Sequence, residues 1–99
     1  MSSYAELEMK VIQWSEARKI IPNSTAYAQS VKAKEEIYEL CDAFDKVEAI
    51  DAVGDTVVCL INVCALLDVN LTDCLEAAYN RIKDRRGYMN AEGIFVKEQ

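Results

Sequence analysis

Residues 45–67 of this 99-residue chain read DKVEAIDAVGDTVVCLINVCALL, and this stretch decides the fold. From Asp55 onward it is apolar on nearly every side when wound as an α-helix, and it is too long and continuous for a single strand. A helix of that kind is buried, often against another subunit. Asp55 and Asn62 interrupt it seven residues apart, which leaves them only about 20° apart around the helix. Because Asp51 and Glu48 precede Asp55 at roughly one-turn intervals, four polar side chains share one face.

Working outward, the pattern predicts three further helices with short connections, which implies an antiparallel all-α, four-helix arrangement. The first has a capping box at Ser3 and Glu6 and is broken at Pro22. We expect one domain over residues 1–99, helical over 3–87, with a short tail over 88–99 in which residues 93–96 are extended. The expected N-caps of the later helices are Ser24 or Thr25, Asp45 and Asn70, and the expected last helix ends at Gly87.

Composition excludes several function classes. The chain has no histidine, so Ser-His-Asp catalysis, histidine zinc sites and histidine pH switches are ruled out. A net charge of −6 disfavours nucleic acid as a partner. We expect no membrane partner, since the apolar runs are shorter than the roughly 20 residues of a span. No signal peptide is recognisable, and the cysteines are predicted to be small buried thiols in a reducing cytoplasm, with a disulfide framework or a zinc site as the minor alternatives.

Charge is concentrated in one part of the chain. Residues 35–55 hold eight acids and one base, Lys46, so this segment carries −7 and the other 78 residues sum to +1. A solvated helix surface usually interleaves both signs. Such a density of carboxylates repels itself unless a positive group lies among them.

The helix expected over residues 24–44 carries a polar face that matches the one on residues 45–67. Glu36 and Glu39 lie three residues apart with Glu35 beside them, and Gln29 and Lys32 lie one to two turns earlier. Two facing helices that each bring carboxylates form an all-oxygen cluster, which hard divalent cations such as Mg²⁺ or Mn²⁺ prefer. The sequence therefore predicts a metal site between these two helices.

The order of these motifs resembles that of the MazG-like all-α nucleoside triphosphate pyrophosphohydrolases of compact, phage or bacterial type. The resemblance spans about residues 14–86. It rests on the order Glu35-Glu36-x-x-Glu39, Asp51-x-x-x-Asp55, Asn62 and Asn80-x-x-Lys83-x-x-Arg86, with Trp14, Pro22-Asn23-Ser24 and Gln29 before it. One departure is Ala52, at the place where the family's second acidic motif has glutamate; we expect Asp51 to take that role.

The resemblance implies an enzyme that cleaves a (d)NTP between the α and β phosphates, giving the monophosphate and pyrophosphate. It implies Mg²⁺ as cofactor, with Mn²⁺ as a substitute, and a homodimer or homotetramer. The implied metal ligands are Glu36, Glu39, Asp51 and Asp55, and the implied base that activates water is Glu35 or Glu39. The implied substrate contacts are Trp14, Gln29, Lys32, Asn62, Asn80, Lys83 and Arg86.

Each feature also has a structural interpretation. Asp55 and Asn62 could be buried polar groups that fix helix register. Lys83 and Arg86 could have no role beyond complementing the dipole at the end of a helix. Trp14 is more readily explained as a core or interface residue than as a stacking surface for a base. The alternative to an enzyme is therefore a non-catalytic helical homo-oligomer that binds a partner protein or a nucleotide signal.

Overall fold

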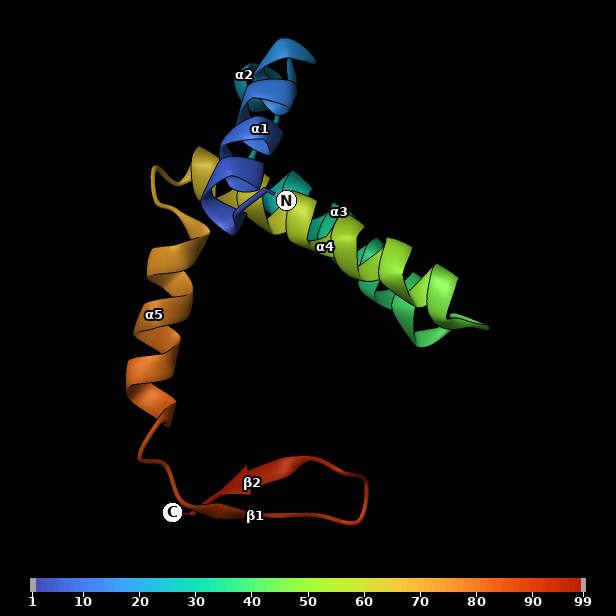
Figure 1. Ribbon diagram of the computed structural model, residues 1–99, viewed down its shortest axis with the longest axis vertical. Coiled ribbons are helices and arrows are strands. Elements are labelled where there is room, and N and C mark those ends of the chain that lie inside the picture. Colours follow the sequence, from blue (N-terminus) through green and yellow to red (C-terminus); the bar gives the residue numbers. More distant parts are fainter. Residues whose placement is uncertain (1, 99) are drawn as a thin grey trace.

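The protein folds as five α-helices followed by a small β-hairpin, in a computed structural model that describes residues 2–98. The helices α1–α4 form a body, α5 extends from it as an arm, and the hairpin lies at the end of that arm (Figure 1). The all-α class predicted from sequence is confirmed. In chain order the elements are α1 (Tyr4–Ala17), α2 (Ile20–Asn23), α3 (Ala26–Cys41), α4 (Lys46–Leu66), α5 (Leu71–Ile82), β1 (Gly87–Met89) and β2 (Phe95–Lys97).

The four longer helices begin where the sequence indicates. At each start a polar side chain accepts a hydrogen bond from the backbone N–H three residues further on, which satisfies one of the unpaired donors of the first turn. The predicted N-caps Ser3, Asp45 and Asn70 are confirmed. At the start of α3 it is Thr25, not Ser24, whose hydroxyl accepts from the backbone N–H of Ala28.

The first helix ends earlier than expected. It stops at Ala17, and Lys19 takes a left-handed backbone conformation with φ of 66° before the single turn of α2. Pro22 lies inside α2 and does not break a helix there, since in a first turn its missing N–H would have no partner anyway. The side-chain amide of Asn23 donates to the Lys19 carbonyl at 2.9 Å, which holds this turn together.

Gly87 does not end the last helix as predicted. The helix α5 ends at Ile82, and Gly87 opens β1, which pairs antiparallel with β2 in the register Tyr88 to Val96. A Cβ at Gly87 would overlap the Val96 carbonyl oxygen and the Phe95 ring, so glycine is required for the approach of the two strands. The extended conformation expected near the end of the chain is present as β2, over residues 95–97.

The core centres on the antiparallel pair α3 and α4, and α4 contacts each of the other helices. By length and composition α4 could cross a membrane, contrary to the sequence-based estimate that no run approaches that length. Within the helical body 28% of the most apolar stretch of α4 is buried. The buried apolar residues of the described chain are small or medium-sized: Ala33, Ala52, Cys59, Ile61 and Cys64.

The expectation for the cysteines differs in part from the structure. All four cysteines are free, and Cys59 and Cys64 are buried as predicted. Cys41 and Cys74 are exposed, so the prediction of uniformly buried thiols is wrong for these two.

Candidate active site

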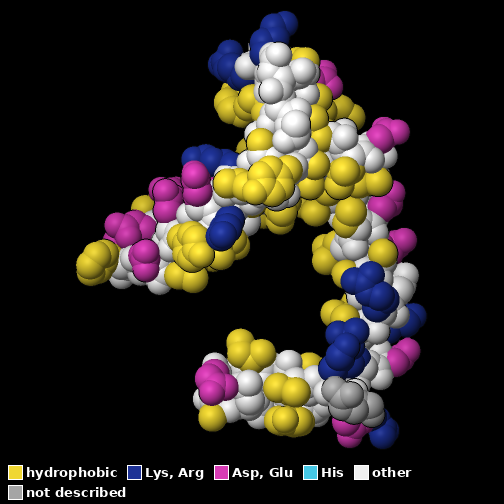
Figure 2. Space-filling view, turned by 180° about the vertical axis from the view of Figure 1, so that it is seen from behind, with side chains coloured by type: hydrophobic (Ala, Val, Ile, Leu, Met, Phe, Trp, Pro, Cys, Tyr) yellow, Lys and Arg dark blue, Asp and Glu magenta, His cyan; other side chains and the backbone are white. Residues whose placement is uncertain are grey.

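An acidic groove lies at the free end of the α3–α4 pair. Because the two helices run antiparallel, the end of α3 meets the start of α4, and this brings Glu39 beside Asp51. Asp42, Glu48 and Ala52 complete the lining of a hollow of about 360 Å³. Figure 2 shows acidic side chains gathered on this end of the molecule. The structure therefore brings together two of the four predicted metal ligands, one from each helix.

Glu36 is the one buried carboxylate on this face of α3, with 7% of its surface exposed. Its Oε1 lies 3.6 Å from Nζ of Lys32, whereas its Oε2 is buried and has no hydrogen-bond partner among the described residues. Lys32 also bonds Oε2 of Glu35 at 3.2 Å. The hydrogen bond to Glu35, with the charges of both glutamates, raises the pKa of Lys32. A buried carboxylate oxygen without a donor is costly, so Glu36 is poised for a positive partner.

Asp55 on α4 and Glu36 on α3 both lie within electrostatic reach of Cys59. Both carboxylates act on the thiol of Cys59, whose pKa is raised first by burial and then by the negative charge of Glu36, with a smaller contribution from Asp55. Asp55 itself is exposed. The structure thus sets Glu39 and Asp51 together in the acidic groove, whereas Asp55 borders a hollow between α1 and α4.

The carboxylate oxygens are ligands of the type that a divalent cation prefers, although within the described residues the structure does not bring three of them to one point. Among residues 2–98 no three carboxylate or thiol groups converge closely enough to hold a metal ion. Mutual repulsion keeps ionised carboxylates apart, and a cation would offset that repulsion. The unpartnered Oε2 of Glu36 and the all-oxygen set of Glu36, Glu39, Asp51 and Asp55 match the ligand preference of Mg²⁺ or Mn²⁺.

The inner end of the same interface holds a chain of hydrogen bonds. The Ser15 hydroxyl donates to Oδ1 of Asn62 at 2.6 Å, Nδ2 of Asn62 donates to Oε1 of Gln29 at 3.1 Å, and Nε2 of Gln29 donates to the Ser24 hydroxyl at 3.1 Å. Asn62 is 2% exposed. Both ends of its amide are thus used inside the protein, as expected for a buried polar group that fixes helix packing. The contact of Asn62 with the substrate stays a prediction.

Trp14 borders a second hollow, between α1 and α4. This hollow of about 500 Å³ is lined by Leu7, Lys10, Val11, Trp14, Asp55 and Val58. The Trp14 ring is 48% exposed, and the Arg18 guanidinium lies 5.9 Å from its centroid. A mainly apolar hollow with an aromatic wall therefore has one of the predicted metal ligands, Asp55, at its border.

The predicted basic contacts do not reach these residues within one chain. Asn80 lies in the last turn of α5, and Lys83 and Arg86 follow it; all three are exposed. The arm carries them away from the α3–α4 pair (Figure 1), and its basic side chains form a separate patch in Figure 2.

Sequence reasoning missed Ser15, Asp42 and Lys10. Ser15 is a small polar residue in an amphipathic helix, where exposure is the usual expectation, yet it is 0% exposed. The signal for Asp42 was present, because it is three residues beyond Glu39 and belongs to the acidic segment. Nothing in the local sequence distinguishes Lys10 from other surface lysines.

The profile of the phosphoribosyl-ATP pyrophosphohydrolase family matches residues 9–81. The chain therefore belongs to this family, and its class is that of the nucleotide pyrophosphohydrolases. The predicted relationship to MazG-like enzymes is confirmed.

A solved structure of similar fold is that of the cyanophage S-2L MazG-like pyrophosphohydrolase, bound to dGDP and three catalytic Mn²⁺ ions per active site. The two folds superpose with a TM-score of 0.79 and 20% sequence identity, over 99% of this chain and 95% of that one. No curated protein matches the chain.

Proposed function

We propose that this protein hydrolyses a nucleoside triphosphate between the α and β phosphates, releasing the monophosphate and pyrophosphate, with Mg²⁺ as cofactor and Mn²⁺ as a substitute. The observation that carries the proposal is the buried Oε2 of Glu36, which has no hydrogen-bond partner in the described chain. Glu36 lies one turn before Glu39, which lines the acidic groove. Family membership supplies the reaction class.

Four carboxylates are proposed to hold the metal: Glu36 and Glu39 from α3, and Asp51 and Asp55 from α4. When bound, the divalent cation neutralises the triphosphate and accepts charge that develops on the reacting oxygens. The Mn²⁺ ions reported for the cyanophage enzyme support this assignment. Because Asp51 stands four residues before Asp55, one turn away, it can take the role left open at Ala52.

The chain's own residues then handle the attacking water and the leaving group. A carboxylate of Glu39 or Glu35 takes the proton of the water as its oxygen attacks phosphorus, and pyrophosphate leaves. Glu35 is held by Lys32 at 3.2 Å, whereas Glu39 lines the groove directly, which favours Glu39 as the base. No covalent intermediate is required, in keeping with a chain that lacks histidine.

The nucleoside is proposed to occupy the hollow beside Trp14. The ring is half-exposed and the hollow adjoins Asp55, so a base stacked there could place its phosphates toward the carboxylates. Gln29, held by Asn62, lies at the inner end of the same interface. The dGDP reported for the cyanophage enzyme supports a nucleotide ligand of this size.

The active form is proposed to be a homo-oligomer, a dimer or a tetramer. The radius of gyration is 15.8 Å, compared with about 13 Å for a compact domain of 100 residues. Large apolar side chains remain exposed along α5 and the hairpin, including Leu75, Tyr79, Ile82 and Phe95. Apolar side chains also gather on the inner side of the arch in Figure 2. Exposed apolar surface on this scale marks an interaction site.

A second copy also offers a role for the basic end of the arm. The residues Arg81, Lys83, Arg85 and Arg86 carry positive charge that complements the −7 of residues 35–55. We place Asn80, Lys83 and Arg86 at the phosphates bound by a neighbouring subunit, where they would stabilise the leaving group. The free thiols are compatible with the proposed cytoplasmic location.

The experiment that tests this function measures pyrophosphate release from the eight standard NTPs and dNTPs, with Mg²⁺ and with EDTA. We expect Mg²⁺-dependent release, together with the matching monophosphate, for at least one nucleotide. Release of inorganic phosphate with a diphosphate would overturn the cleavage site. Turnover that persists in EDTA would overturn the metal assignment.

A further inference from the structure

The arm α5 is attached to the body of the protein at a single elbow. Among the described elements α5 contacts only α4. The connection, residues 67–70, turns through Asp68, which has a φ of 59°, and the Val69 backbone N–H bonds the Cys64 carbonyl at 2.9 Å. The direction in which α5 leaves the body therefore depends on a short connection and on the contact between two helix ends.

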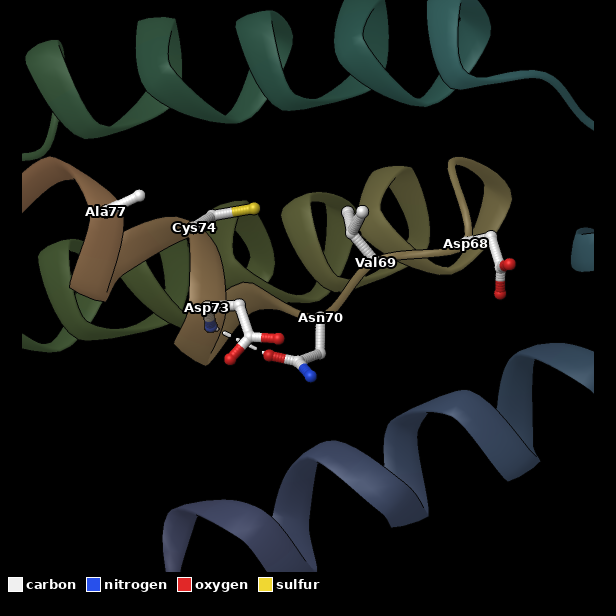
Figure 3. A pocket seen from close by; sticks show the side chains of 6 residues that line it. All are labelled: Asp68, Val69, Asn70, Asp73, Cys74 and Ala77. Carbon is white, nitrogen blue, oxygen red and sulfur yellow. Dashed lines mark hydrogen bonds between the residues drawn. The ribbon is translucent and has the colours of Figure 1, made fainter.

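Two thiols meet at this elbow. The Sγ atoms of Cys64, on α4, and Cys74, in the second turn of α5, lie 3.9 Å apart. Cys64 is buried and Cys74 is exposed. Figure 3 shows the Cys74 side chain extending from α5 over the α4 ribbon, beside Asn70 and Asp73 in an open hollow that solvent can enter. A disulfide has an S–S distance of about 2.0 Å, so the two sulfurs need to approach by about 2 Å.

We propose that Cys64 and Cys74 are a site of reversible oxidation, where an intramolecular disulfide fastens α5 to α4. The oxidant is a low-molecular-weight disulfide such as oxidised glutathione. The Cys74 thiolate attacks one of its sulfurs, forms a mixed disulfide and releases one thiolate. The Cys64 sulfur then attacks the Cys74 sulfur, its proton goes to solvent, and the second thiolate leaves. Two protein thiols are oxidised while one small disulfide is reduced to two thiols.

The surroundings of the two sulfurs set their order of reaction. Burial, with the hydrogen bond to Cys74, raises the pKa of the Cys64 thiol to about 11, so Cys64 stays protonated near neutral pH. Cys74 is reached by solvent and is the attacking thiol; Cys64 is the resolving thiol. The other two thiols, Cys41 and Cys59, have no sulfur in contact within the described chain.

The consequence is a change in the freedom of the arm. The closed disulfide spans ten residues and includes the whole turn at Asp68. Because α5 has no other attachment among the described elements, this covalent link restricts the angle between α4 and α5.

The test treats the full-length protein with oxidised glutathione, unfolds it, blocks the remaining thiols with N-ethylmaleimide and records the intact mass. We expect a species with two blocked cysteines, no glutathione adduct at Cys74, and a linked peptide pair containing Cys64 and Cys74. Amide hydrogen exchange over residues 67–70 should slow in the oxidised protein and recover after reduction.

The test variant is Cys74→Ser and its matched control is Cys41→Ser; each removes one exposed thiol. Cys74→Ser should abolish the linked pair, and Cys41→Ser should leave it intact. A stable glutathione adduct on Cys74, with Cys64 still blocked by the reagent after unfolding, would overturn the proposal. A linked pair with unchanged hydrogen exchange over residues 67–70 would overturn the fixing of the elbow.

Discussion

The Ser15 hydroxyl and the Asn62 side-chain carbonyl lie 2.6 Å apart although 47 residues separate them in the chain. Ser15 is 0% exposed and Asn62 is 2% exposed, so neither can exchange its partner for water. Through Asn62 the bond continues to Gln29, which ties α1, α4 and α3 together at the inner end of the site. The orientation of the Gln29 amide therefore depends on Ser15 through Asn62, although Ser15 does not itself bond Gln29.

Ser15→Ala should lower the free energy of unfolding by about 1–3 kcal/mol, because the buried Oδ1 of Asn62 loses its donor. Urea denaturation measures the change. The matched control is Ser30→Ala, at an exposed serine whose hydroxyl bonds a carbonyl of its own helix, and we expect less than about 0.5 kcal/mol there. Equal effects at the two serines would contradict a special role for the Ser15 bond.

Asp55→Asn should reduce kcat for pyrophosphate release by at least about 100-fold, since a neutral amide supports a metal poorly and stabilises charge less well. Circular dichroism and light scattering should match the parent protein, because Asp55 is exposed and makes no described hydrogen bond. Asp84→Asn, an exposed acid beyond α5, serves as the control with unchanged kcat. Retained turnover in the Asp55 variant would remove this residue from the site.

Glu36→Gln should abolish the rise in melting temperature that Mg²⁺ produces, while the metal-free variant is at least as stable as the parent. The reason is the buried Oε2, which has no hydrogen-bond partner in the described chain and gains a positive ligand when a cation binds. Glu35→Gln is the control, since the Glu35 side chain is 60% exposed, and should keep most of the Mg²⁺ shift. A full Mg²⁺ shift in the Glu36 variant would contradict its role as a ligand.

Leu75→Lys should convert the proposed homo-oligomer to a smaller species at micromolar concentration. Leu75 is 68% exposed on the apolar face of α5, and a charge there would have to be buried against the partner. Multi-angle light scattering gives the molar mass. Thr72→Lys, an exposed change on the same helix, should leave the assembly intact. If the parent protein is itself a monomer in this measurement, the proposal of an oligomer interface on α5 is refuted.

The free energy of unfolding should fall as the pH rises from 9 toward 11. Burial raises the pKa of Cys64 from its usual 9.0 to about 11, so the folded state holds this proton more tightly than the unfolded state does. That contribution is complete below pH 9 and is lost as the pH approaches 11. Urea midpoints across this range should fall less steeply for Cys64→Ala than for Cys41→Ala. Parallel slopes for the two variants would argue against the raised pKa.

Most of the helical framework follows from local sequence. The caps at Ser3, Asp45 and Asn70 and the apolar pattern of residues 46–66 act over a few residues, so they can be recognised without knowledge of the partners. The polar face that places Asp51 and Asp55 on one side of α4 is also a property of helix geometry. The early end of α1 at Ala17 could not be predicted, because it depends on a left-handed turn at Lys19.

The site is only partly a local property. The sequence by itself determined which residue types lie on which helix face, and hence that carboxylates of two helices could meet. Tertiary structure decided that Glu36 is buried while Glu35 is exposed, that both ends of the Asn62 amide bond inside the protein, and that Cys64 meets Cys74. The physical reason is that burial, pairing and loss of water depend on which faces of distant segments pack together, and periodicity within one segment does not contain that information.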